Sequence, residues 1–145
     1  MKSFVKFWRL PTGERFLLLS AFFYLAAARI ALWVFPLQKI VKRAETLKVS
    51  KTFSASPEKI ASAIGVVSRR LPGLRNCLVQ ALAGQVFLAR QGHISQIRIG
   101  VARKQDGQFQ AHAWVEYAGQ IIIGGGAGVS QFTVLPPLEF QHEKR

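Results

Sequence analysis

The chain is poor in cysteine, histidine and acidic residues, and each shortage excludes a class of protein. Its 145 residues include one cysteine, so no intramolecular disulfide can form and nothing indicates an oxidising compartment. One cysteine and 3 histidines match none of the usual zinc-ligand spacings, so we expect no metal site. Lys and Arg number 20 against 7 Asp and Glu, a formal net charge of +13. We therefore expect a cytoplasmic protein with acidic or anionic partners.

The excess of positive charge admits nucleic acid, an anionic membrane or an acidic peptide as a partner. Basic residues are scattered along the chain, and the sequence contains no zinc-finger spacing, no RNP-type aromatic motif and no recognition helix. We therefore expect no nucleic-acid binding. A membrane surface and an acidic peptide both stay open, as does a basic surface that is simply solvated.

The length of the chain allows one compact domain and a short extension. Half of the residues are apolar and 11% are aromatic, so the chain can bury a core. A second full domain is excluded. We divide the chain into an N-terminal hydrophobic helical region, residues 1–50, and a domain that carries the candidate chemistry, residues 51–145.

Residues 16–35 form an apolar segment in which Arg29 is the only charged side chain. The segment is long enough to span a membrane. Arg29 opposes a simple span, because a central Arg costs about 2.5 to 3.5 kcal/mol on insertion scales. Three alternatives stay open: a helix packed on the domain, a helix that touches or spans a membrane, and a cleaved signal peptide. Pro36 should end or kink this helix in each case.

Two further helices begin with clear capping signals. Ser56 stands in the cap position before Pro57, and the helix that follows should run to about Arg70. Asn76 can cap a second helix whose first residue is Cys77. Beyond this helix the hydrophobic period changes from helical spacing to alternation, which indicates strands.

The remaining segments alternate between apolar and polar residues. Residues 97–101 and 109–116 alternate in this way, and Asp106–Gly107 between them is a hairpin turn. Ala118–Gly119 makes a second tight turn into residues 121–123. We therefore expect an α+β domain: helices first, then an antiparallel sheet of three or four strands.

Cys77 and His112 occupy positions that favour nucleophilic chemistry. The unpaired N–H groups and the dipole at a helix start stabilise a thiolate, although a lone cysteine is also used as a small buried side chain. A histidine on a strand packed against that helix could accept and return a proton, although it could also be an ordinary hydrogen-bonded histidine. Their joint placement favours Cys77 as nucleophile, His112 as base and the Cys77 N–H as an oxyanion donor.

Other candidates are close to this pair in the sequence. Trp114 could wall a substrate groove, although core packing is the role that we favour, and Gln80 could line the cleft one turn after Cys77. Gly124–Gly126 lacks the Lys-Ser/Thr ending of a phosphate loop, so we interpret it as a loop beside the active site. The candidate substrate-binding residues are Asn76, Gln80, Trp114, Gly124 and Gly125.

Several of these segments resemble a known family. Residues 76–82 (NCLVQAL), residues 111–116 (AHAWVE) and the following Ile123-Gly124-Gly125 are similar to the peptidase domain of the lasso peptide biosynthesis B protein. That domain is a transglutaminase-like cysteine protease, and the resemblance covers about residues 56–138. The resemblance implies a transglutaminase/papain-like core over residues 51–145.

The resemblance also implies an activity and its partners. The activity is removal of the leader from a ribosomally synthesised lasso precursor peptide through a Cys77 thioester, without a cofactor. The implied partners are the precursor, a separate leader-binding protein and an ATP-dependent cyclase. Two other functions use the same residues and stay open: a transglutaminase-like acyltransferase, and a non-catalytic scaffold that binds a peptide or a membrane.

One position departs from the family pattern. The family's triad commonly ends in an Asp on the strand after the histidine hairpin, and that place falls at about Gly124. If Tyr117 pairs with Gln120, His112 lies opposite Gly125, which also has no side chain. The carboxylate of Glu116 lies four residues, roughly 13 Å, along the strand. We therefore expect a Cys-His dyad whose imidazole is held by a backbone carbonyl or a water, while Glu116 pairs with a nearby basic residue.

Overall fold

The computed structural model describes residues 5–6, 8–45, 55–125 and 131–135. Four α-helices and a 3-10 turn come first among these residues, and four strands follow. They are α2 (Thr12–Val34), α3 (Leu37–Glu45), α4 (Pro57–Arg70), η1 (Pro72–Leu74), α5 (Cys77–Arg90), β1 (Gln96–Arg103), β2 (Phe109–Tyr117), β3 (Gln120–Ile123) and β4 (Thr133–Val134). This order confirms the predicted α+β class.

Both capping predictions are confirmed at the starts of α4 and α5. The Ser56 side chain accepts a hydrogen bond from the Lys59 N–H, with Pro57 in the first turn. The Asn76 side chain accepts one from the Leu78 N–H at 2.8 Å. Each bond satisfies a backbone donor that has no partner within the helix, which fixes where the helix begins.

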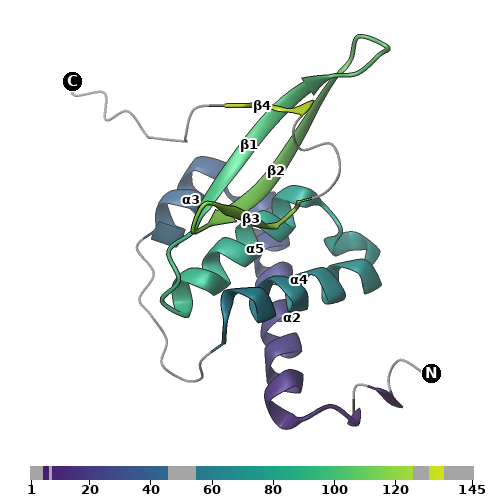
Figure 1. Ribbon diagram of the computed structural model, residues 1–145, viewed down its shortest axis with the longest axis vertical. Coiled ribbons are helices and arrows are strands. Elements are labelled where there is room, and N and C mark those ends of the chain that lie inside the picture. The colour runs from purple at the N-terminus through teal and green to yellow at the C-terminus, as the bar shows by residue number, and fades with distance from the viewer. Residues whose placement is uncertain (1–4, 7, 46–54, 126–130, 136–145) are drawn as a thin grey trace.

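The four strands form one antiparallel sheet in the order β3-β2-β1-β4 (Figure 1). Tyr117 pairs with Gln120, as predicted, because Ala118 (φ 50°) and Gly119 (φ 79°) both adopt the positive φ that a tight hairpin turn requires. The sheet covers the helical core on one face only. Figure 1 shows the helices on one side of it, with α5 directly against the sheet.

The core contains residues from α2, α4, α5 and the inner face of the sheet. Ala113, Val115 and Ile123 point toward α5 and are buried with Leu82 and Phe87. Because side chains alternate along a strand, the intervening His112, Trp114 and Glu116 belong to the opposite face. The hairpin therefore supplies core packing from one face and the candidate base from the other.

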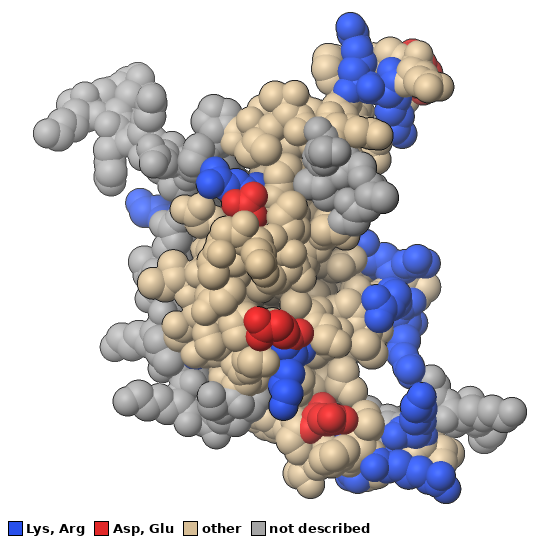
Figure 2. Space-filling model, in the orientation of Figure 1, with Lys and Arg blue, Asp and Glu red and all other residues tan. Residues whose placement is uncertain are grey.

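Helix α2 shares this core with the rest of the molecule. Ala21, Leu25 and Ala28 are buried against α4 and α5, so one side of the helix packs on the domain. The helix ends at Val34 and Pro36 precedes α3, as predicted. By length and composition α2 could also cross a membrane or serve as a signal near an N-terminus. On the face shown in Figure 2, Lys and Arg gather mainly along one edge.

The close approach of α5 to β3 depends on Gly84. A Cβ at this position would overlap the Cδ1 of Ile123, which is buried. We predict that Gly84→Ala lowers the free energy of unfolding by about 1–3 kcal/mol through overpacking, despite a gain of about 1 kcal/mol in helix propensity. Urea denaturation measures this difference.

Two variants control for this effect. Gly65→Ala in α4 would place a Cβ 3.4 Å from the Arg69 guanidinium, an ordinary contact, and should be neutral or stabilising. Ile123→Val removes the Cδ1 and should recover most of the loss when combined with Gly84→Ala. Equal stabilities of the Gly84→Ala and Gly65→Ala variants would contradict close packing of α5 on β3.

Candidate active site

Cys77 is the first residue of α5. It is half-buried and packs at the edge of the hydrophobic core. The first N–H groups of a helix have no intrahelical acceptor, so the backbone N–H of Cys77 can donate to a developing oxyanion. Asn76, predicted as a substrate-binding residue, is the cap whose side-chain oxygen is occupied by the Leu78 N–H. Its observed contact is therefore structural.

The imidazole of His112 is held by backbone and aromatic contacts. Its Nε2 lies 2.7 Å from the carbonyl oxygen of Gly124. A carbonyl only accepts, so Nε2 donates, and in the neutral ring Nδ1 is left as an acceptor. The ring also stacks on Trp114 at a centroid distance of 6.0 Å and lies 5.4 Å from Phe132. These contacts fix both the tautomer and the orientation of the ring.

The pairing of β2 with β3 contains a β-bulge shortly before Gly124. Glu116 pairs with Ile121 but Val115 pairs with Ile123, so Ile122 has no partner of its own across the strand. The expectation that His112 lies opposite Gly125 assumed regular pairing and is wrong, because the bulge shifts the register and the described pairing of β2 with β3 ends at Val115 and Ile123. β3 ends at Ile123, and Gly124, which follows it with a φ of +78°, places its carbonyl oxygen 2.7 Å from His112 Nε2.

Gly124 cannot readily be replaced by the aspartate that the family resemblance places there. Its φ is +78°, and a Cβ would lie 2.8 Å from the carbonyl oxygen of Ala113. A side chain therefore meets both an unfavourable backbone conformation and a backbone overlap. The backbone carbonyl takes the place of an aspartate as the partner of His112, which is one of the two arrangements expected from the sequence.

Trp114 stacks on the His112 ring, and Glu116 in turn holds Trp114. The Trp114 Nε1 donates to Glu116 Oε1 at 3.1 Å, and the Arg98 Nε donates to Glu116 Oε2 at 3.3 Å. Glu116 thus pairs with a nearby basic residue, as predicted. Trp114 is 1% exposed and fills the space over Gly100, where a Cβ would clash with it. It is positioned to support the imidazole from behind and has almost no surface to offer a substrate.

No hydrogen bond joins the Cys77 thiol to the His112 imidazole in the described structure. Cys77 packs on the side of the helical core, whereas His112 shares the outer face of β2 with Trp114. Catalytic hydrogen bonds are often long or misaligned in unliganded enzymes and shorten when substrate binds. The pairing of Cys77 with His112 stays a prediction.

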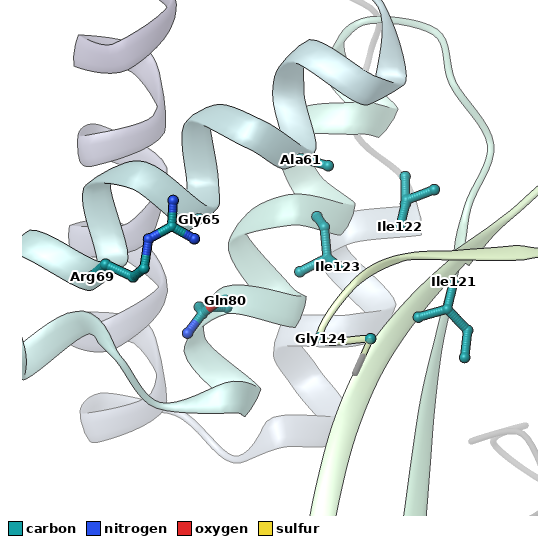
Figure 3. A pocket seen from close by; sticks show the side chains of 9 residues that line it. Ala61, Gly65, Arg69, Gln80, Ile121, Ile122, Ile123 and Gly124 are labelled. Atoms are coloured by element: carbon teal, nitrogen blue, oxygen red, sulfur yellow. The ribbon is translucent and has the colours of Figure 1, made fainter. Parts of the chain in front are cut away.

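A cavity of about 630 Å³ lies between α4, α5 and the end of β3 (Figure 3). It contains three of the predicted residues, Gln80, Gly124 and Gly125. Gln80 donates its Nε2 to the Arg75 carbonyl at 3.0 Å, which leaves its side-chain oxygen for a ligand. The full lining is Ala61, Gly65, Arg69, Gln80, Ile121, Ile122, Ile123, Gly124 and Gly125.

Arg69 is the residue in this cavity that sequence reasoning missed. Figure 3 shows its guanidinium beside Gly65 at the cavity, and no described carboxylate lies within ion-pair distance of it. Gly65 and Arg69 are four residues apart and share a helix face, which is the available sequence signal. The cavity thus combines one cation and one amide with an isoleucine wall.

In the described part of the chain, no three His, Cys, Asp or Glu side chains come close enough together to hold a metal ion. The candidate groups are therefore a thiol, an imidazole, an amide and a guanidinium, supported by backbone N–H and carbonyl groups. This set can perform acyl transfer by covalent catalysis.

Comparison with known proteins identifies the class. The model of the transglutaminase-like superfamily matches residues 22–136, so the chain belongs to this superfamily. The matched residues include Cys77, His112 and the cavity. No curated protein and no solved structure matches the chain. The family match confirms the transglutaminase-like part of the resemblance, and this superfamily includes cysteine proteases and acyltransferases.

We predict that Gly124→Ala weakens the hydrogen bond between the His112 imidazole and the carbonyl of residue 124. The left-handed φ costs an alanine about 1–2 kcal/mol, and its Cβ would also overlap the Ala113 carbonyl. Gly119→Ala is the matched control, because its φ of +79° is the same but nothing lies within 4 Å of its Cβ. Denaturation should show the larger loss for Gly124→Ala.

The imidazole itself provides the second measurement. Nitrogen NMR of His112 should show the Nε2–H tautomer in the parent protein and in Gly119→Ala, and a loss of that preference in Gly124→Ala. If the two variants were equally stable and kept the same tautomer, the Gly124 carbonyl would not be the group that holds the ring.

Proposed function

We propose that the protein is a cysteine peptidase that removes the leader from a ribosomally synthesised, lasso-type precursor peptide. The observation that carries this proposal is the hydrogen bond from His112 Nε2 to the Gly124 carbonyl, which leaves Nδ1 as a proton acceptor. It occurs in a transglutaminase-like chain whose single cysteine begins α5. The sequence resemblance of residues 76–82 and 111–116 supports the narrower assignment to leader removal.

In the proposed reaction His112 takes up and returns each proton that is transferred. The Cys77 thiol gives its proton to Nδ1 of His112, and the thiolate attacks the carbonyl carbon of the scissile amide. Negative charge develops on the carbonyl oxygen, where the Cys77 N–H can donate. As the C–N bond breaks, the imidazolium protonates the departing amine and a thioester remains. Water, deprotonated by the same imidazole, hydrolyses this thioester and restores the thiol.

This scheme requires the thiol and the imidazole to approach one another when a peptide occupies the cavity. The cavity supports this requirement, because Gln80 of α5 and Gly124 beside His112 line the same space. A peptide bound there would contact the helix that carries Cys77 and the loop that holds the imidazole. Closure of a site around substrate is a common way to complete a catalytic arrangement.

An acyltransferase is the second candidate, favoured by membership of a superfamily that includes such enzymes. It would form the same thioester on Cys77, but an amine would replace water as the acceptor. The two functions differ only in the product: hydrolysis releases a free carboxylate, whereas transfer forms a new amide.

The proposed setting follows from the proposed reaction. We assign the enzyme to the cytoplasm, where a free thiol stays reduced. Its proposed partners are the precursor peptide, a separate leader-binding protein that presents it, and an ATP-dependent cyclase that consumes the released amine.

Substitution of the two catalytic residues tests the proposal. We predict that Cys77→Ser and His112→Gln each lower kcat/KM for precursor cleavage by about 100-fold or more, because each removes nucleophilic or acid–base catalysis. His93→Gln is the matched control for His112→Gln, since the Nε2 of His93 also donates to a carbonyl, that of Ala55, at 2.8 Å. A glutamine amide can keep either hydrogen bond but cannot transfer the proton.

Mass spectrometry of the precursor supplies the measurement. Cleavage with uptake of one water supports the peptidase, and a new amide supports the transferase. Full activity of Cys77→Ser or His112→Gln would overturn both candidates. No turnover by the parent protein with its precursor and leader-binding partner would leave the non-catalytic scaffold as the better function.

Arg69 gives the cavity a preference for negative charge. Its guanidinium is the one charged side chain among the described residues that line the cavity, and the isoleucine side chains there cannot solvate an ion. A substrate carboxylate near the scissile bond would pair with Arg69, whereas a Lys at that position would be repelled.

We predict that Arg69→Gln raises KM about fivefold for a precursor with an acidic residue beside the cleavage site, the change expected for an exposed ion pair of about 1 kcal/mol. A precursor with a neutral residue there should be unaffected. Arg70→Gln is the control, because Arg70 lines a different groove. If Arg69→Gln changed KM equally for both precursors, Arg69 would not discriminate between substrates by their charge.

A further inference from the structure

Helix α2 exposes an apolar face that the core does not use. We define the α2 face by its exposed large apolar side chains: Phe16, Leu19, Phe22, Phe23, Ile30 and Trp33. Trp33 is 88% exposed, Phe23 67% and Ile30 62%. With 3.6 residues per turn, these positions lie on one side of the helix, roughly opposite Ala21, Leu25 and Ala28 in the core. Large contiguous apolar patches of this kind mark interaction sites.

We infer that the α2 face docks the protein on the surface of an anionic membrane, with the helix lying in the interface and not across the bilayer. The buried side of α2 excludes a simple span within this fold. Ala21, Leu25 and Ala28 pack on α4 and α5, and the Arg29 Nη1 donates to the Gly73 carbonyl at 3.0 Å. A helix surrounded by lipid would have to give up all of these contacts.

Cations border the α2 face where lipid phosphates would lie. A groove of about 240 Å³ between α2 and α4 has an apolar floor that includes Leu19 and Phe22. Lys6 and Arg70 line the same groove. An apolar surface with adjacent cations matches acyl chains together with anionic headgroups. Arg9 and Arg15 precede or begin α2, and Lys39 and Lys42 follow it in α3, so positive charge is present at both ends.

The charge of the whole chain argues against a second copy as the occupant of this face. Each copy carries a formal charge of +13, and a symmetric dimer through the α2 face would bring the two sets of cations together. An anionic bilayer instead gains from the same charge. Figure 2 shows many of the Lys and Arg side chains along one edge of the molecule, whereas the acidic side chains stand singly, most of them away from that edge.

Vesicle sedimentation tests the inference without any substrate. The full chain should bind vesicles of about 30% phosphatidylglycerol in phosphatidylcholine, bind pure phosphatidylcholine weakly, and dissociate as salt rises toward about 0.5 M. The variant Phe23→Glu/Trp33→Glu should lose at least tenfold in affinity. The control Ile94→Glu/Phe109→Glu adds the same charge at side chains that are 90% and 73% exposed elsewhere, and it should bind as the parent does.

Two further measurements separate the other occupants. Alkaline carbonate should release the vesicle-bound protein, since an interfacial helix is extractable and a spanning helix is not. Sedimentation equilibrium without lipid should show a monomer for the parent and for both double variants. The inference is overturned if the folded parent does not bind anionic vesicles, if carbonate fails to release it, or if Phe23→Glu/Trp33→Glu dissociates a lipid-free oligomer.

Discussion

The hydrogen bond from the His112 imidazole to the Gly124 carbonyl links the end of the sheet to the candidate chemistry. Two local features accompany it: a glycine that accepts positive φ just beyond the end of β3, and a buried Trp114 stacked on the ring. Because a carbonyl can only accept, the bond determines which imidazole nitrogen keeps its proton. A backbone carbonyl thus orients the imidazole, a role that a carboxylate commonly has. The orientation of His112 therefore depends on the backbone conformation at Gly124 more than on the identity of a side chain.

The sequence predicted those parts of the fold that local chemistry decides. The Ser56 and Asn76 caps placed two helix starts, and the turn at Ala118–Gly119 placed the second hairpin. It could not predict the bulge at Ile122, because three consecutive isoleucines give no signal of which one lacks a cross-strand partner. That single residue shifts the register of the end of β3 relative to β2. Regular pairing therefore gave the right strands and the wrong neighbour for the imidazole.

Arg69 was missed, and the alternatives for α2 stayed open, for a different reason: both depend on contacts between distant segments. Arg69 meets Gln80 and β3 only after α4 packs on α5. Helix α2 is apolar around most of its circumference, and from sequence alone a core helix, a span and an interfacial helix have the same composition. Its small residues Ala21 and Ala28 allow close packing on the domain, whereas its large Phe23 and Trp33 face outward. Only the tertiary structure separates these two sides.

The excess of positive charge on the chain supports both proposed interactions, with an acidic peptide and with an anionic membrane, but through different side chains. Glu116 is paired with Arg98 on the outer face of β2, so it adds little negative potential near the cavity, where Arg69 is the charged group among the described lining residues. Lys6 and Arg70 instead border the groove beside α2. Both sets of interactions should weaken as salt rises, because exposed charges are screened over about 10 Å at 0.1 M. Salt alone therefore cannot distinguish peptide selection from membrane docking. Substitutions in the apolar α2 face can, because this face would contribute a salt-independent term to lipid binding and supplies none of the described residues that line the cavity with Arg69.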